Sequence, residues 1–168
     1  MTTLPSNKHL PIHLLAACFN KKTTAYKFYW LLSIIEQVEQ GRTLIPKIDL
    51  FAGMVSNAWY TVNYFHVSFG KQDRMEERIK EIKDIEGLTV DLGKTEIYDR
   101  LKSSKNNKTI TALFQFNKQV PHWFLSPWFP GKKEQEVKAL SSELKYLAPY
   151  SLQQEFITVN LLWVNYFK

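Results

Sequence analysis

The sequence predicts a mostly α fold: a single compact helical domain of about six to seven helices with an aromatic, proline-rich loop. Hydrophobic residues make up 45% and aromatic residues 14% of the 168 residues, which is enough for one buried core. Several stretches place apolar residues three and four apart, as one face of a helix requires. Gly41 and Gly87 directly follow two of these stretches, where helices commonly end. We therefore expect residues 1–168 to form one helical domain, which is compatible with a longer chain.

The region around Cys18 is expected to form a short amphipathic helix that places the thiol in the core. Leu15–Cys18 also has the form of a bacterial lipoprotein cleavage site, but Pro11 and His13 interrupt the apolar run that such a leader needs. A single cysteine excludes an intramolecular disulfide and paired-cysteine zinc sites. No apolar stretch is long enough to cross a bilayer, so we expect a cytoplasmic protein without membrane contact.

Two largely buried helices are expected next. The first covers Thr23–Gln40, which is apolar on most of its circumference and ends before Gly41. The second begins near Pro46, whose missing N–H costs nothing at the first helical position, and runs toward Phe65. Gln72–Glu86 then predicts an amphipathic helix with a solvated, charged outer face.

The rest of the chain is less regular. Lys94–Leu101 predicts one or two helical turns, and Ser103–Lys108 predicts a loop by composition. Thr109–Phe116 fits a short strand or the start of a helix. Lys132–Leu144 and Leu152–Phe167 both show helical spacing of their apolar residues.

Three prolines, Pro121, Pro127 and Pro130, bracket the segment HWFLSPWF (His122–Phe129). Proline in a helix interior removes a hydrogen bond and clashes with the preceding turn, so this segment cannot be one long helix. We expect a compact aromatic loop.

The histidines offer weak catalytic candidates. His9 and His13 stand four apart, but Pro11 lies between them and no further ligand follows nearby, so we assign no metal site. His66 and Asn63 could orient a water or a phosphate, although a hydrogen-bonded, half-buried histidine is commoner. A self-contained hydrolase would need a polar pocket around His66. Neither a nucleophile elbow nor a glycine-rich phosphate loop is present, so we assign no catalytic residues and no cofactor.

The net charge of +6 favours a polyanionic partner such as DNA, although such a charge also occurs in proteins that bind no nucleic acid. Residues 1–50 and 101–168 carry an excess of Lys and Arg, whereas acids slightly outnumber bases in residues 51–100. Basic side chains bind phosphates, and the candidates lie in turns or at helical spacing. They are Lys21, Lys22, Lys71, Arg74, Arg78, Lys132 and Lys133, each of which is equally compatible with ordinary solvated surface.

Three segments, Leu15–Gly41, Leu50–Asp73 and His122–Phe129, together resemble the N-terminal region of bacterial proteins classed as HNH endonucleases. The resemblance implies that the nuclease motif, a histidine base with a divalent metal at the scissile phosphate, lies nearer the C-terminus of longer relatives. That motif is not found in this sequence, so its catalytic residues and its metal cannot be placed here. The apolar C-terminal residues fit a chain that continues into such a module.

Two functions are expected from these features. The first is a non-catalytic accessory domain of an HNH-type nuclease that contributes DNA contact or target selection. The alternative is a helical assembly domain that binds a protein partner, or a second copy of itself, through the loop at residues 121–130. Its contact residues would be Trp123, Phe124, Trp128 and Phe129. A continuous basic stripe would favour DNA, and basic residues scattered around an apolar patch would favour protein contact.

Overall fold

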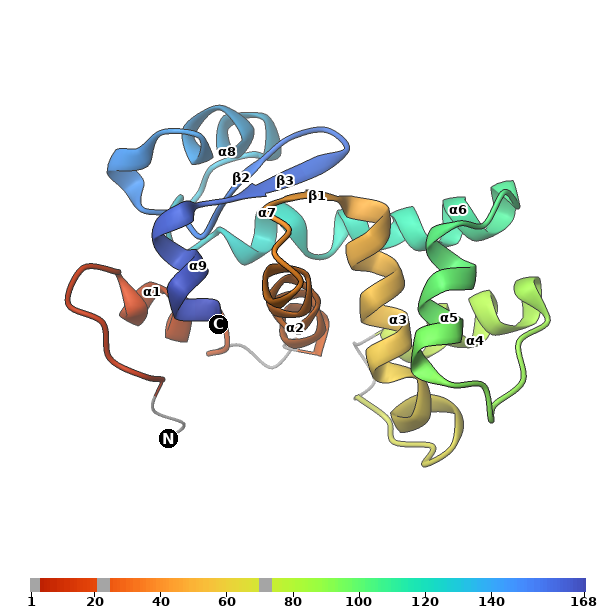
Figure 1. Ribbon diagram of the computed structural model, residues 1–168. Helices are drawn as coiled ribbons and strands as arrows, with labels where there is room; N and C mark the ends of the chain where they lie inside the picture. Colours follow the sequence, from red (N-terminus) through yellow and green to blue (C-terminus); the bar gives the residue numbers. More distant parts are fainter. Residues whose placement is uncertain (1–3, 21–24, 70–73) are drawn as a thin grey trace.

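The computed structural model describes residues 4–20, 25–69 and 74–168 (Figure 1). Its elements, in chain order, are α1 (Ile12–Ala17), α2 (Ala25–Glu39), β1 (Leu44–Pro46), α3 (Lys47–Asn63), α4 (Met75–Glu86), α5 (Lys94–Lys102), α6 (Asn107–Phe114), η1 (Gln115–Lys118), α7 (Pro121–Phe124), α8 (Glu134–Ser141), η2 (Leu144–Tyr146), β2 (Tyr150–Leu152), β3 (Phe156–Val159) and α9 (Leu161–Phe167). The predicted mostly α, single-domain fold is confirmed. Among the described helices, none combines the length and apolar composition needed to cross a membrane.

Helix α3 is the central element. Most of its side chains are buried, and α2, α4, α5 and α6 all pack against it. Helix α2 approaches closely at Gly53, where an added Cβ would lie 2.8 Å from the Ser33 hydroxyl oxygen. The predicted burial of both helices is therefore correct, and a glycine in the middle of α3 allows their backbones to come together.

The predicted helix ends are largely correct. Gly41 follows α2 with φ +80°, and Gly87 caps α4 with φ +62°, a conformation that glycine adopts without a steric penalty. The predicted starts of α2 at Thr23 and of α4 at Gln72 lie outside the described residues. Pro46 is the N-cap residue of α3, directly before the first helical residue. The helix ends at Asn63 rather than near Phe65.

Residues 109–116 contain no strand. Helix α6 begins at Asn107, because the Asn106 side chain accepts a hydrogen bond from the Lys108 backbone N–H at 3.0 Å and so caps the first turn. The buried Thr109 hydroxyl donates to the Glu86 carboxylate at the end of α4. Of the two alternatives open for this segment, the helix is correct, and the predicted loop is shorter than residues 103–108.

The C-terminal helix predicted over Leu152–Phe167 is wrong for its first half. Strands β2 and β3 form an antiparallel hairpin, and β3 also pairs with β1, with Leu44 opposite Thr158. Ile157 and Val159 point into the core in the alternating pattern of a strand. Only α9 is helical. The pairing partner of β3 comes from residues 44–46, so local spacing could not reveal it.

Cys18 is fully buried, as expected for a small core residue. Its thiol donates to the carbonyl oxygen of Phe124 at 3.2 Å and so joins the end of α1 to α7. Burial raises the pKa of Cys18 to about 12. The thiol therefore stays protonated and unreactive near neutral pH.

The hydroxyl of Tyr150 connects three parts of the core. It accepts a hydrogen bond from the Trp30 indole N–H at 3.0 Å and donates one to the Pro121 carbonyl oxygen at 2.6 Å. Trp30 and Tyr150 are both fully buried. Burial raises the pKa of Tyr150 well above its ordinary value, so the hydroxyl keeps the proton that it donates. One side chain thus ties β2 to α2 and to the start of α7.

Replacing Tyr150 with Phe should lower the free energy of unfolding by about 2 kcal/mol or more, because two buried polar groups lose their partner. Urea denaturation monitored by circular dichroism measures the change. Tyr64→Phe, which removes a hydroxyl from an exposed ring, is the matched control and should change stability by less than about 0.5 kcal/mol. Equal stability of the two variants would contradict the role assigned to this hydroxyl.

Candidate nucleic-acid interface

The basic residues predicted to contact DNA do not form one group. Arg74 and Arg78 lie at the start of α4, whereas Lys132 and Lys133 precede α8, and these helices lie at opposite ends of the molecule (Figure 1). Lys21, Lys22 and Lys71 lie outside the described residues. Two separate basic surfaces therefore remain as candidates.

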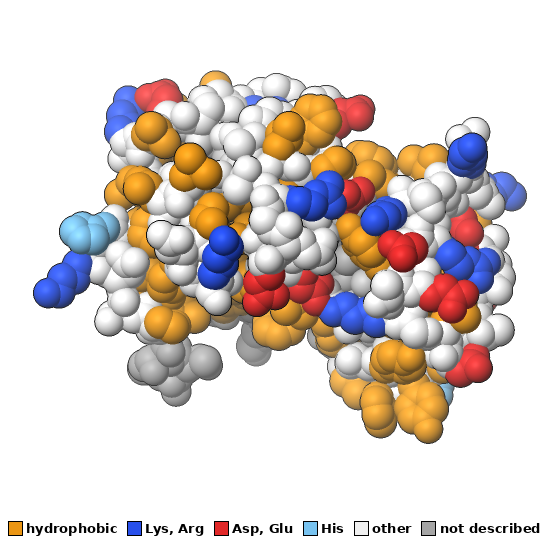
Figure 2. All heavy atoms as spheres, viewed as in Figure 1, with side chains coloured by type: hydrophobic (Ala, Val, Ile, Leu, Met, Phe, Trp, Pro, Cys, Tyr) orange, Lys and Arg blue, Asp and Glu red, His pale blue; other side chains and the backbone are white. Residues whose placement is uncertain are grey.

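The surface around α4 is locally neutral. Arg78 forms an ion pair with Glu81 at 2.9 Å, and Arg74 lies 3.9 Å from Glu77. On the face of the molecule seen in Figure 2, Lys and Arg side chains alternate with Asp and Glu over the half that contains α3 and α5. That face carries no continuous basic stripe, and acidic side chains outnumber basic ones along α4.

The aromatic loop is mostly part of the core. Phe124, Trp128 and Phe129 are buried, whereas Trp123 keeps 54% of its surface exposed. Trp128 packs edge-on against Trp163 with ring centroids 6.0 Å apart. Of the four aromatics predicted to contact a partner, Trp123 alone lies on the surface.

Trp123, Phe129, Lys132 and Lys133 line one pocket, with a volume of about 350 Å³. His122, Ser126, Gly131, Glu134 and Val137 complete its wall. Gly131 adopts φ +73° and turns the chain between the aromatic loop and α8, so that the two lysines come back toward the ring of Trp123. Residues predicted separately for DNA and for protein contact thus share one site, which we call the α7–α8 pocket.

His122 is the polar residue of the α7–α8 pocket that is least satisfied. Its Nδ1 atom is buried and has no hydrogen-bond partner among the described residues. Burial lowers the pKa of His122; the Glu134 carboxylate opposes this shift, and the charges of Lys47 and Lys138 add to it. The ring is therefore neutral at pH 7 and carries one donor and one acceptor nitrogen. It lies 4.9 Å from the Trp123 ring, at 40° to it.

The charges around the pocket leave a positive edge. Glu134 pairs with Lys138 at 3.1 Å, and Lys132 pairs with Glu136 at 3.5 Å across an exposed surface. Within the described part of the chain, the Lys133 ammonium has no ion-pair partner. Exposed pairs are worth little, so both Lys132 and Lys133 are available to an anion.

Behind the pocket, a polar network leads to a buried cation. Lys138 donates to the Gln154 side chain at 2.8 Å, and the Gln154 carbonyl oxygen accepts from Lys47 at 3.0 Å. The Lys47 ammonium also donates to the Asn117 side chain at 2.9 Å, and Lys47 has no exposed surface. This network fixes the turn between β2 and β3 against α3 and η1.

The other histidine candidates do not form sites. His66 is exposed, whereas Asn63 is buried and its amide donates to the Trp59 carbonyl oxygen of the same helix. His9 precedes α1 and His13 lies within it, so the two do not share a helix face. Within the described residues, no group of three or more His, Cys, Asp or Glu side chains could hold a metal ion.

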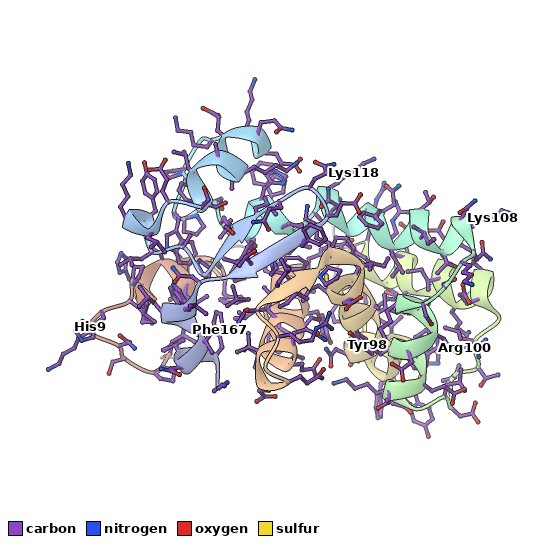
Figure 3. The ribbon with its side chains drawn as sticks, turned by 45° about the horizontal axis from the view of Figure 1, so that its top comes forward. His9, Tyr98, Arg100, Lys108, Lys118 and Phe167 are labelled. Carbon is purple, nitrogen blue, oxygen red and sulfur yellow. The ribbon has the colours of Figure 1, made fainter. Side chains whose placement is uncertain are left out.

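A second hollow, of about 440 Å³, lies between α2 and α5, where Figure 3 labels Tyr98. Its polar groups are already matched to one another. The Tyr98 hydroxyl accepts a hydrogen bond from Gln37, and the Glu36 carboxylate binds both Lys94 and Asn57. This hollow is therefore a weaker candidate than the α7–α8 pocket.

Sequence reasoning missed His122, Ser126 and Glu134 as site residues. His122 stands next to Trp123 between prolines, which was the available signal. The position of Glu134 depends on the turn at Gly131.

The titration of Lys47 should be visible in the pH dependence of stability. Burial, with a further contribution from Lys138, lowers the pKa of Lys47 from 10.5 to about 8, against the opposing charges of Glu134 and Glu155. Between about pH 8 and 10.5 the unfolded chain holds a proton that the folded chain has lost, so the free energy of unfolding contributed by this group rises with pH. Below about pH 8 its contribution is constant.

Urea denaturation of the wild type and Lys47→Met at intervals across this range checks the prediction. The wild type should gain stability relative to the variant as the pH rises from about 8. Other titrating groups are common to both proteins and cancel in the difference. Parallel pH profiles would show that Lys47 keeps its ordinary pKa.

Comparison with known proteins shows one distant similarity. The chain is 28% identical over 92 residues to the guanine nucleotide-binding protein alpha-12 subunit of Dictyostelium discoideum. The match covers 55% of this chain and 26% of that protein, so the chain spans about a quarter of its relative. No protein-family model and no solved structure matches the chain. These comparisons do not place the chain in a family.

Proposed function

We propose that this chain is a non-catalytic accessory domain that contacts nucleic acid for an HNH-type nuclease, and that the contact is made at the α7–α8 pocket. The observation that carries the proposal is the exposed ring of Trp123 in one pocket with Lys132 and Lys133. Lysines bind the phosphate backbone, and an exposed aromatic ring provides a stacking surface for a base. Sequence resemblance to the N-terminal region of HNH endonucleases supports DNA as the nucleic acid.

We do not extend guanine nucleotide binding from the Dictyostelium protein to this chain. Loops that bind nucleotide phosphates need closely spaced glycines, so that backbone N–H groups can surround the anion. The six glycines of this chain are scattered singly along the sequence.

A second candidate function is protein contact through the end of α3. Tyr64, Phe65 and Val67 expose 64%, 67% and 46% of their surfaces, and the Tyr64 and Phe65 rings lie 5.1 Å apart. Hydrophobic side chains gather at the lower right of Figure 2. A cluster of exposed aromatics is a frequent feature of protein interfaces. We propose this α3-end patch (Tyr64, Phe65 and Val67) for the assembly role, because most aromatic side chains of the loop at residues 121–130 are buried.

Binding of a short labelled DNA duplex across a salt series tests the proposed function. Affinity should fall steeply between about 50 and 200 mM salt, because phosphate contacts release counterions. The double variant Lys132→Ala/Lys133→Ala should bind about tenfold more weakly and lower the salt slope by about 2. Fluorescence anisotropy measures both quantities.

Two matched variants separate a local site from general charge. Lys105→Ala/Lys108→Ala removes two positive charges near the start of α6, where Figure 3 labels Lys108, and should leave binding within about twofold. Arg74→Ala/Arg78→Ala should behave in the same way, because these arginines lie at the start of α4, at the other end of the molecule from the α7–α8 pocket. Equal losses in all three variants, or no binding at about 50 mM salt, would contradict the proposal.

A further inference from the structure

We propose that the α7–α8 pocket receives one unpaired nucleobase, so that the preferred ligand is a single strand or a duplex with an extruded base rather than a perfect duplex. This inference rests on the proposed function and names the class of ligand. It follows from the shape of the pocket, from the polar groups in its wall and from the position of the two lysines.

The size and the aromatic wall of the pocket fit one planar ring. Its volume of about 350 Å³ lies at the low end for small-molecule sites, which favours a ligand the size of a single base. Trp123 keeps 54% of its surface exposed, and buried Phe129 and Val137 form an apolar floor. Every nucleobase has a π face, so stacking on Trp123 requires no particular sequence.

Polar groups in the wall complement the edge of a base. His122 lines the wall through the accessible part of its ring, while its Nδ1 atom is buried in the protein without a partner among the described residues and does not face a ligand. The Ser126 hydroxyl lines the same wall. Glu134 is paired with Lys138, so its carboxylate adds acceptor oxygens without leaving an unbalanced negative charge.

The lysines lie where a phosphate would follow the base. Lys132 and Lys133 lie directly before α8, are exposed, and line the pocket. Lys133 has no ion-pair partner within the described residues. A base held on Trp123 therefore leaves its backbone next to the lysines. Such a combination of stacking ring and adjacent cations is typical of single-strand binding sites.

A perfect duplex cannot use this pocket without disruption. Its bases are stacked and paired, and moving one into a pocket costs the free energy of unstacking and unpairing unless the base is already unpaired. A duplex would thus contact the lysines alone. The preference for unpaired bases is the consequence that separates this inference from general DNA contact.

The full chain can be titrated with three labelled DNAs of equal length: a single strand, a perfect duplex and a duplex with one bulged base. The single strand and the bulged duplex should bind more tightly than the perfect duplex. Trp123→Ala should weaken binding of these two by about tenfold and leave perfect-duplex binding unchanged, whereas Trp123→Tyr, which keeps an aromatic ring, should retain most of the preference. Tyr64→Ala, which removes an exposed ring from the α3-end patch, should bind like the wild type.

Tryptophan fluorescence gives a second readout. Trp30, Trp59 and Trp163 are fully buried and Trp128 is 7% exposed, so Trp123 is the exposed one of the five tryptophans. Single-stranded DNA should quench the solvent-exposed part of the emission in the wild type and leave the emission of Trp123→Tyr unchanged.

The outcomes separate the two proposals. Equal affinity for all three DNAs, with no effect of Trp123→Ala and no quenching, would overturn the base pocket. If Lys132→Ala/Lys133→Ala still weakened binding in that case, the proposed DNA contact would stand. No salt-dependent binding of any of the three would overturn both.

Discussion

The buried hydroxyl of Tyr150 is the contact on which the arrangement of the C-terminal half depends. It holds β2 against Trp30 of α2 and against the carbonyl oxygen of Pro121, which is the first residue of α7. Helix α8 also packs on β2. The strand β2 therefore contacts both α7 and α8, which form the two walls of the α7–α8 pocket. A buried polar group that is fully hydrogen-bonded specifies a single packing, because every alternative leaves a donor or an acceptor without a partner.

The long helices were predictable because the sequence features that mark a helix lie within the helix or directly beside it. Apolar spacing and a following glycine mark α2 and α4, and the predicted C-terminal ends of both helices agree with the structure to within a few residues. The strands were not predictable, because β3 pairs with residues 44–46, which are distant in the sequence. The spacing of Phe156, Val159 and Trp163 is also that of one face of a helix. In the structure Phe156 is 43% exposed while Val159 and Trp163 are buried, so the apparent stripe is divided between a strand and a helix.

The sequence identified several residues of the candidate site, but it did not predict that they lie in one pocket. Lys132 and Lys133 were identified by charge, and Trp123 by its place among prolines. Their proximity results from the turn at Gly131 and from the burial of Phe124, Trp128 and Phe129, which leaves Trp123 as the exposed ring. No periodic pattern encodes such an arrangement, because it depends on how neighbouring side chains share the core. The pairing of Arg74 and Arg78 with Glu residues also became visible only in three dimensions, although their spacing of three allowed it.

The pairing of β1 with β3 also determines when this domain can complete its sheet. Leu44 pairs with Thr158, so the three-stranded sheet cannot close until the ribosome has synthesised more than 110 further residues after β1. During synthesis, β1 and the adjacent end of α3 would remain exposed until β3 is available to pair with β1. Contacts between residues so far apart in the sequence also slow the final step of folding. A truncation that removes β3 would therefore leave an incomplete core that is prone to aggregate, although helices α2, α3 and α4 would still be present.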